Sequence, residues 1–233
     1  MIWTITVKLF TIIKDKKLYK RRYIVALGIL GNKVGMTQIF TKNGNAVPVT
    51  IIKSSPCFIT QIKTTPIHGY NAVQLGYIKQ QSNEKGYKKP LLGHFSKNNL
   101  PFFRFLKEYK VENIEQYNIG DSFSVDLFKV GHFITVSGLT IGKGNTSNIK
   151  RHKFGRGPMS HGSKHHRLQG SLGAGTSPGR VFPGKKMPGR VGMDKRTIKS
   201  LEILDIDLID NIIVLKGSVP GKAGNLLSLT FDK

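Results

Sequence analysis

One short motif has the spacing of a hydrolase nucleophile. Residues 175–179, Gly-Thr-Ser-Pro-Gly, match the pattern in which a strand-to-helix turn presents a serine for attack. That chemistry requires the main-chain N–H of the following residue to stabilise the oxyanion. The following residue here is Pro178, which has no N–H, and no apolar strand precedes the motif. We therefore expect no catalysis at Ser177.

Histidines form a second group that could do chemistry, because imidazole binds metal ions. His161 and His165 have the i, i+4 spacing of a metal-binding pair on a helix. However, a glycine separates them, no acidic ligand is near, and neighbouring cations oppose a metal ion. Together with His152 and His166, they are better suited to donate hydrogen bonds to phosphate.

A third motif, Gly142-Lys143-Gly144, resembles part of a nucleotide-binding phosphate loop. The full pattern needs a glycine five residues before the Gly-Lys pair and a Ser or Thr after the lysine. Ser137 stands at the first of these positions and Gly144 at the second. A main-chain turn lying on RNA phosphates is the better interpretation.

The net charge indicates a polyanionic partner. The 233 residues carry 37 Lys and Arg against 13 Asp and Glu, a formal charge of +24. Such a charge weakens a compact fold unless nucleic acid or an anionic membrane surface neutralises it. No apolar run approaches the roughly 20 residues that a membrane helix needs. Cys57, the single cysteine, can form neither an internal disulfide nor a cysteine-based zinc site, which indicates a reducing compartment.

More than half of this charge lies in one glycine-rich segment, residues 137–200. It contains 14 Lys or Arg, one acid (Asp194) and 13 of the 26 glycines, whereas Val, Ile, Leu and Phe make up only 10 of its 64 residues. Such a segment cannot build its own core. We expect an arm that becomes ordered against RNA phosphates, with glycines that let the backbone approach closely. A solvated basic segment is the alternative.

Aromatic residues are scarce in this arm, which contains only Phe154 and Phe182. Proteins that stack the bases of single strands use several exposed aromatics. The arm is therefore expected to recognise the backbone and shape of folded RNA.

Short β-rich runs flank the arm on both sides. They predict a mainly β fold, a closed barrel in which strands before residue 137 pair with strands after 197. Residues 80–115 lack clear alternation and are expected to form a small insert of helix and loop. The predicted strands are residues 46–53, 58–63, 71–77, 123–128, 132–136, 197–206, 211–219 and 226–231.

Three segments resemble the universal large-subunit ribosomal protein L3 family. They are GILGNKVGMTQIF (28–40), the long loop motif at 150–192 and NIIVLKGSVPGKAG (211–224). The resemblance covers residues 27–231, and IGKG (141–144) and GAGTSPGR (173–180) are similar to the cyanobacterial and plastid branch. It implies three parts: a basic N-terminal extension at 1–26, a β-barrel domain at 27–136 and 197–231, and an extended rRNA-binding loop at 137–196.

The resemblance also implies a function without catalysis, metal or other cofactor. The barrel, of the translation-protein type with a small α+β insert, would bind near the 3′ end of the large ribosomal RNA early in assembly. The loop, at about 157–190, would reach toward the peptidyl transferase centre. The partners would be ribosomal RNA and neighbouring ribosomal proteins, in a plastid ribosome or, alternatively, the bacterial cytoplasm. The residues expected to bind rRNA are Lys143, Lys150, Arg151, Lys153, Arg156, His161, Lys164, His165, His166, Arg167, Arg180, Lys185, Lys186, Arg190, Lys195 and Arg196.

The sequence departs from the family pattern at three places. Thr176 stands where many bacterial relatives have a glutamine that is methylated in some, and Asn145 replaces a usual phenylalanine at the loop base. Residues 1–26 precede the usual start and are either a real extension or the result of a start site placed too far upstream.

Two other classes of protein would share the charge. An organelle-targeted RNA enzyme would need a catalytic constellation, which none of the motifs above supplies. A DNA-binding architectural protein would need a recognition helix or a minor-groove wedge, and the Gly- and Pro-rich arm predicts no helix.

Overall fold

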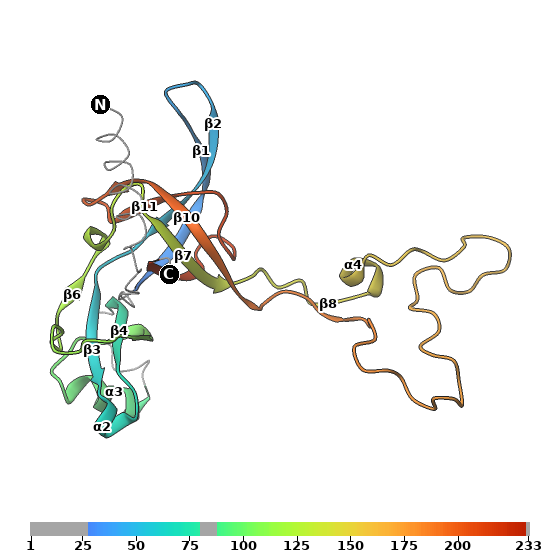
Figure 1. Ribbon diagram of the computed structural model, residues 1–233, viewed down its shortest axis with the longest axis horizontal. Coiled ribbons are helices and arrows are strands. Elements are labelled where there is room, and N and C mark those ends of the chain that lie inside the picture. The colour runs from blue at the N-terminus through green and yellow to red at the C-terminus, as the bar shows by residue number, and fades with distance from the viewer. Residues whose placement is uncertain (1–27, 80–87, 232–233) are drawn as a thin grey trace, which may run out of the picture. The chain divides into compact units, whose positions relative to one another are not determined.

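A computed structural model describes residues 28–79 and 88–231 (Figure 1). These residues form a mainly β structure with a few short helices, as the sequence predicts. The chain divides into two compact units: an insert unit, which consists mainly of Ser55–Leu127, and a sheet-and-loop unit, which consists of Leu30–Ser54 and Phe128–Leu229. The expected N-terminal extension, residues 1–26, lies outside the described residues.

Six strands form the main sheet of the sheet-and-loop unit. They are β1 (Ile29–Phe40), β2 (Ala46–Lys53), β7 (Phe133–Leu139), β10 (Lys195–Asp207), β11 (Ile212–Lys216) and β12 (Leu226–Phe231). Their order is β1-β12-β7-β10-β11-β2, and β1 also pairs with β2. Because β7 pairs with β10 and β2 with β11, the prediction that strands from the two sides of the arm pair is confirmed.

All six strands contribute buried side chains to an apolar core, and on β7 the burial alternates. On β7, Ile134 and Val136 are fully buried and their neighbours are more exposed. Gly138 continues the buried row at a place where a Cβ atom would come within 2.6 Å of the Leu227 side chain. Burial of each Ile, Val or Leu stabilises a fold by about 1.5–3 kcal/mol. The core thus holds β7, from which the arm leaves, in a fixed position.

A buried lysine on β1 holds the segment that precedes β12. Lys33 is 8% exposed, and its Nζ donates hydrogen bonds to the carbonyl oxygens of Val219 (3.1 Å) and Gly221 (3.0 Å). The main chain adds a bond from Gly224 N to the oxygen of Lys33 (2.7 Å). Because a buried charge needs hydrogen-bonding partners, these carbonyls compensate part of the cost of desolvating the ammonium group.

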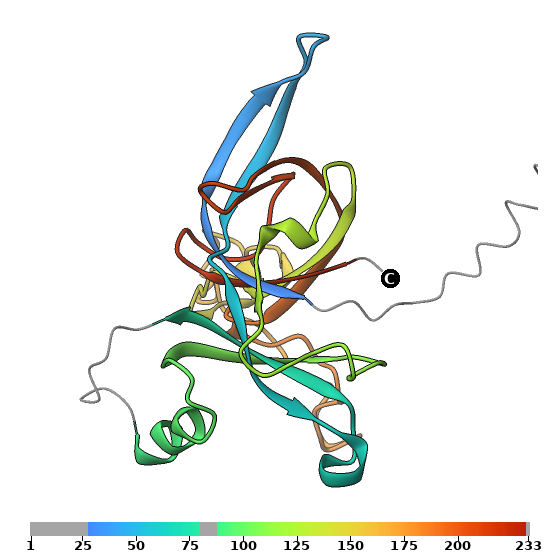
Figure 2. The same ribbon diagram turned by 90° about the vertical axis from the view of Figure 1, so that its left-hand side faces the viewer.

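The β1–β2 ribbon was only partly expected from the sequence. Figure 2 shows these strands as a long two-stranded ribbon that ends in the turn at residues 41–45. The range predicted for β2 is confirmed, but β1 was not predicted as a strand. Gly31 and Gly35 interrupt its pattern, and Val34 and Met36 are both about half exposed, so β1 lacks the alternation that marks a half-buried strand.

The insert unit is built on a second sheet, with the strand order β5-β4-β3-β6. Its elements are β3 (Cys57–Lys63), α2 (Thr65–His68), β4 (Ala72–Lys79), α3 (Lys89–Ser96), β5 (Phe103–Lys110), β6 (Ser122–Phe123) and the 3-10 turn η2 (Val125–Leu127). The α3 side chain Phe95 is fully buried and packs edge-on against Phe103 of β5, with ring centroids 6.0 Å apart. Gly76 on β4 leaves room for the Phe103 ring.

Three local predictions need correction. Residues 80–115 contain the strand β5 besides a helix, because β5 pairs along its length with β4 despite its weak alternation. The strand predicted at 123–128 is wrong beyond Phe123, where Ser124 Oγ donates to Asp126 (2.6 Å) and η2 follows. The strand predicted at 211–219 ends at Lys216, because Gly217 has a φ of +95°.

Candidate nucleic-acid interface

The basic arm leaves the main sheet as a hydrogen-bonded pair of chain segments. Beyond the last β7–β10 pair, Thr140 N donates to the oxygen of Asp194 (2.9 Å), and Lys143 N donates to the oxygen of Val191 (2.9 Å). Gly192, with a φ of +78°, is required here because a Cβ would collide with the carbonyl oxygen of Ile141. The two halves of the arm therefore start in a fixed register.

A two-stranded ribbon follows, made of β8 (Asn145–Thr146) and β9 (Gly189–Arg190). Asn145, which stands where the family pattern has phenylalanine, is exposed and pairs opposite Arg190. The side chain of residue 145 is therefore exposed, and the position is held by main-chain pairing with Arg190.

The short helix α4 (Asn148–His152) lies against the returning half of the arm (Figure 1). Arg151 Nη1 donates to the oxygen of Met187 (3.0 Å), and His152 Nε2 lies 3.0 Å from the same oxygen. Asn148 Nδ2 donates to the oxygen of Lys186 (3.3 Å). A helix in the arm was not predicted, because the glycine and proline content of the arm as a whole obscured residues 145–154, which contain neither.

Farther along the arm, two segments of irregular chain are joined by a smaller set of contacts. Gly157 N donates to the oxygen of His166 (3.0 Å), and His166 Nδ1 lies 2.8 Å from the oxygen of Pro158. Because a carbonyl oxygen only accepts, His166 must carry its proton on Nδ1. A Cβ on Gly157 would collide with the oxygen of His165, so a glycine is needed at this crossing.

The histidine pair with metal-binding spacing is not on a helix. His161 lies in a turn with a φ of +58°, and His165 follows it in irregular chain. Within residues 28–79 and 88–231, no three His, Cys, Asp or Glu side chains gather as a metal site would require.

All of the residues predicted to bind rRNA are exposed. Most lie between β7 and β10, but Lys195 and Arg196 belong to β10 itself, opposite Leu139 and Gly138. Arg151 and His166 each have one intramolecular partner, as described above. In the part of the chain that the structure describes, no acid forms an ion pair with any of these cations; the ion pairs found there are Lys63–Glu108 and Lys216–Glu202. Within the described residues, these cations are therefore not neutralised by ion pairs and are available to a polyanion.

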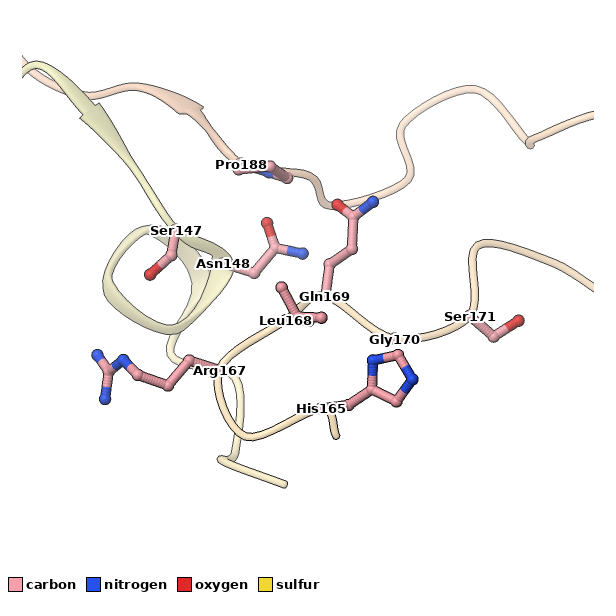
Figure 3. Close-up of a pocket in the computed structure, with 9 residues that line it drawn as sticks. All are labelled: Ser147, Asn148, His165, Arg167, Leu168, Gln169, Gly170, Ser171 and Pro188. Atoms are coloured by element: carbon pink, nitrogen blue, oxygen red, sulfur yellow. The ribbon is translucent and has the colours of Figure 1, made fainter. Parts of the chain in front are cut away.

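Sequence reasoning missed two polar residues of the arm, Asn148 and Gln169. Asn148 is 3% exposed, and one side-chain oxygen of each residue is buried without a described partner. They lie 21 positions apart, and nothing in the sequence signals that both line one pocket (Figure 3). Separately, none of the described helices has the length and apolar character that crossing a bilayer demands.

Comparison with known proteins gives a consistent result. The family model for ribosomal protein L3 matches residues 107–211. A protein of Gracilaria tenuistipitata var. liui named large ribosomal subunit protein uL3c is 55% identical over 203 residues, which are 87% of this chain and 98% of the relative. Large ribosomal subunit protein uL3 of Synechococcus elongatus is 53% identical over 88% of this chain and 96% of its own length. A uL3c protein of Emiliania huxleyi is 52% identical over 87% and 97%. The chain belongs to the ribosomal protein L3 family.

Proposed function

We propose that this chain is a structural constituent of the large ribosomal subunit and that its arm binds large-subunit ribosomal RNA. The observation that carries the proposal is the arrangement of the arm. Its cations are all exposed and lack acidic partners among the described residues, and a ribbon and a short helix fix the start of the arm. Relatives more than 50% identical over most of this chain are named as large-subunit proteins. No enzymatic activity is assigned, since the family is structural.

Two groups of these cations differ in how their backbone is held. Lys143, Lys150, Arg151 and Lys153 lie near the ribbon and α4, where the backbone is held by hydrogen bonds. Those from Arg156 to Arg180 lie on irregular chain, whose main-chain N–H groups would add contacts to phosphate or 2′-hydroxyl oxygens. The arm is thus proposed to bind the RNA backbone through the whole set of rRNA-binding residues given above.

The finer features of the family belong to the same proposal. The main sheet would be a closed barrel of the translation-protein type; the pairing of β1 with β2, which stand at the two ends of the strand order, supports this. The functional division would be a β domain at 27–136 and 197–231, with an insert at about 80–115 and a loop at 137–196. The protein would bind near the 3′ end of the rRNA early in assembly and extend its loop toward the peptidyl transferase centre.

The relatives also support a proposal for the cellular location. Proteins named uL3c from a red alga and a haptophyte, and proteins named uL3 from cyanobacteria, are about equally similar to this chain. We place the protein in a plastid ribosome, with the bacterial cytoplasm as the alternative, beside neighbouring large-subunit proteins.

Binding of the full-length protein to defined RNAs tests the function. The substrates are transcripts of large-subunit rRNA, of its 3′-terminal portion and of small-subunit rRNA, together with duplex DNA of equal charge. Tighter binding to the first two, and co-sedimentation with large subunits after a high-salt wash, are expected, because contacts buried between RNA helices are screened less than surface contacts. Equal affinity for duplex DNA would instead support an architectural DNA-binding protein.

A further inference from the structure

One aromatic ring of the arm is left uncovered. Phe182 is 60% exposed, and no ring or cation of another described residue lies against it. The other aromatic residue of the arm, Phe154, is half-buried and lies beside the ring of His152, with ring centroids 6.1 Å apart. Single exposed apolar residues are common on protein surfaces, so exposure alone assigns no role to Phe182. The role follows from how the chain presents the ring and from the charge around it.

A tight turn fixes the backbone that presents this ring. Lys185 N donates to the main-chain oxygen of Phe182 (3.3 Å), so residues 182–185 form a β-turn with Phe182 at its first position. Pro183 at the second position and Gly184, with a φ of +78°, at the third are typical of a type II turn. The two residues after Lys185 accept hydrogen bonds from α4 through their carbonyl oxygens. The ring is therefore carried by an ordered backbone, and binding would have to order little more than its side chain.

The charge beside Phe182 indicates a nucleic acid as the partner. Arg180, Lys185 and Lys186 are exposed, and no described acid forms an ion pair with them. The sequence contains no Asp or Glu between Asp126 and Asp194. An exposed ring between cations suits a ligand that carries phosphates along its backbone and flat apolar faces beside them, as a nucleic acid strand does. An acidic protein segment would match the charge but would not supply the flat faces.

We propose that Phe182 stacks on an unpaired nucleobase of the large-subunit rRNA, while the flanking cations bind nearby phosphates. Every base has a face that can stack on an aromatic ring, so this contact requires no particular base. In folded RNA, the bases of loops and bulges are the ones whose faces are open to such a contact. The inference rests on the RNA-binding function proposed above and deepens it, because it adds one base contact to an arm that is otherwise expected to bind the backbone.

Substitutions of Phe182 separate stacking from charge and from general apolar contact. Phe182→Leu keeps an apolar side chain but removes the ring, whereas Phe182→Tyr keeps the ring. Val181→Ala is the matched control, because Val181 is the adjacent residue and is 42% exposed. Each full-length variant is bound to a large-subunit rRNA transcript at several salt concentrations, and the melting temperature of each free protein is measured. Short-wavelength ultraviolet light then joins stacked aromatic side chains to bases, and mass spectrometry locates the nucleotide adduct within the tryptic peptide 181–185.

The native protein and Phe182→Tyr should bind about equally well and carry a nucleotide adduct at position 182. Phe182→Leu should lose the adduct and about tenfold in affinity, the scale of one base stacked on an aromatic ring. Its slope of log K against log salt should not change, because an uncharged ring releases no counterions. Its melting temperature should also stay the same, because the ring is mostly exposed in the free protein. Val181→Ala should resemble the native protein.

Other results would overturn the stacking contact. Native affinity of Phe182→Leu for rRNA would remove it and leave the RNA-binding function standing; if that variant also failed to enter large subunits, Phe182 would instead contact a protein. A lower salt slope or melting temperature of Phe182→Leu, with no recovery in Phe182→Tyr, would show a structural role. An equal loss of affinity in Val181→Ala would show a general apolar contact. Failure of the native protein to prefer large-subunit rRNA over duplex DNA would overturn both proposals.

Discussion

Arg151 donates a hydrogen bond from Nη1 to the main-chain oxygen of Met187, 3.0 Å away and 36 positions along the chain, and so joins the outgoing and returning halves of the arm. Arg151 was expected from the sequence to bind RNA. Its guanidinium has five N–H donors, so this bond and a phosphate contact are compatible. The residue therefore combines an internal structural contact with an exposed positive charge.

The Arg151 contact should stabilise the base of the arm in the free protein. Replacing Arg151 with Gln removes a hydrogen bond worth about 1 kcal/mol, so amide exchange around β8 and β9 should become roughly fivefold faster. Lys150→Gln is the matched control, because it removes the same charge from the adjacent residue, whose side chain makes no described hydrogen bond. Equal acceleration in both variants would show that charge, and not the hydrogen bond, sets the stability of the ribbon.

Two neighbouring glycines should respond differently to alanine. A Cβ at Gly157 would collide with the carbonyl oxygen of His165, whereas a Cβ at Gly155 meets nothing within 4 Å. Gly157→Ala should therefore separate the two segments and expose the main-chain N–H of residue 157, which donates to His166 in the native protein. Amide exchange at this position and the ring resonances of His166 provide the measurement, with Gly155→Ala as the control. Amide exchange in the Gly157→Ala variant as slow as in the native protein would contradict the expected clash.

Lys33 should contribute to the stability of the sheet-and-loop unit. Lys33→Met keeps a long apolar side chain but leaves the carbonyls of Val219 and Gly221 without their charged donor. A loss of about 2 kcal/mol in the free energy of unfolding is expected, the scale of a hydrogen bond to a charged group. Urea midpoints measure it, with the exposed Lys42→Met as control. A Lys33→Met variant as stable as the native protein would mean that these carbonyls find other donors.

The stability of the insert unit should depend on one glutamate at acid pH. A hydrogen bond from Lys63, 2.5 Å away, holds the pKa of Glu108 below its usual value; burial opposes this, and a bond from the Tyr70 hydroxyl supports it. Because the folded-state pKa is lowered, Glu108 contributes stability at neutral pH that is lost as the pH falls through that pKa. The hydrogen bond to Glu108 is in turn the largest cause of the raised pKa of Lys63. The stability that Lys63 contributes is lost only as the pH rises through its own folded-state pKa.

Glu108→Gln should accordingly be less stable than the native protein at neutral pH and lose less stability on acidification. Urea midpoints between about pH 7 and pH 3, which span the usual titration of glutamate, measure this. Glu115→Gln, an exposed residue of the same unit without a described ion pair, is the control. The same acid slope in Glu108→Gln and the native protein would contradict the role of the ion pair.

The parts of the fold that the sequence predicts well are short runs rich in β-forming apolar residues. The ranges predicted for β2 and β12 coincide with the structure, because both runs are rich in Val, Ile or Leu and contribute buried side chains to the core. β5 was missed because Leu106 and Lys107 break the alternation of its apolar and charged residues, and its strand conformation depends on pairing with β4, a non-local contact. The arm was identified by composition alone, whereas α4 inside it depends on contacts with Met187.

The candidate site, like the fold, could be predicted only in part from the sequence. Exposure of the cations could be expected from the chain, because a segment with few apolar residues cannot bury them. The pocket could not be expected, because Asn148 and Gln169 are ordinary polar residues until the chain crosses at Gly157 and α4 meets the returning segment.

The lysines at 185 and 186 should bind phosphate through charge alone. Their backbone is held, since Lys185 N donates to Phe182 (3.3 Å) and the oxygens of Lys186 and Met187 accept from α4, and both side chains are exposed. Ordering them on RNA therefore costs less than on a flexible chain.

Replacing both with Ala should weaken rRNA binding without changing the preference among RNAs. It should also lower the slope of log K against log salt by about 0.7–0.9 for each lost contact. Lys185→Arg should bind normally, because a phosphate accepts either cation; loss of binding by that variant would indicate a shaped pocket for the ammonium group. Removal of two exposed lysines outside the arm, Lys42 and Lys129, controls for general charge. Filter binding at several salt concentrations measures the slopes, and an unchanged slope after the double substitution would show that Lys185 and Lys186 do not contact phosphate.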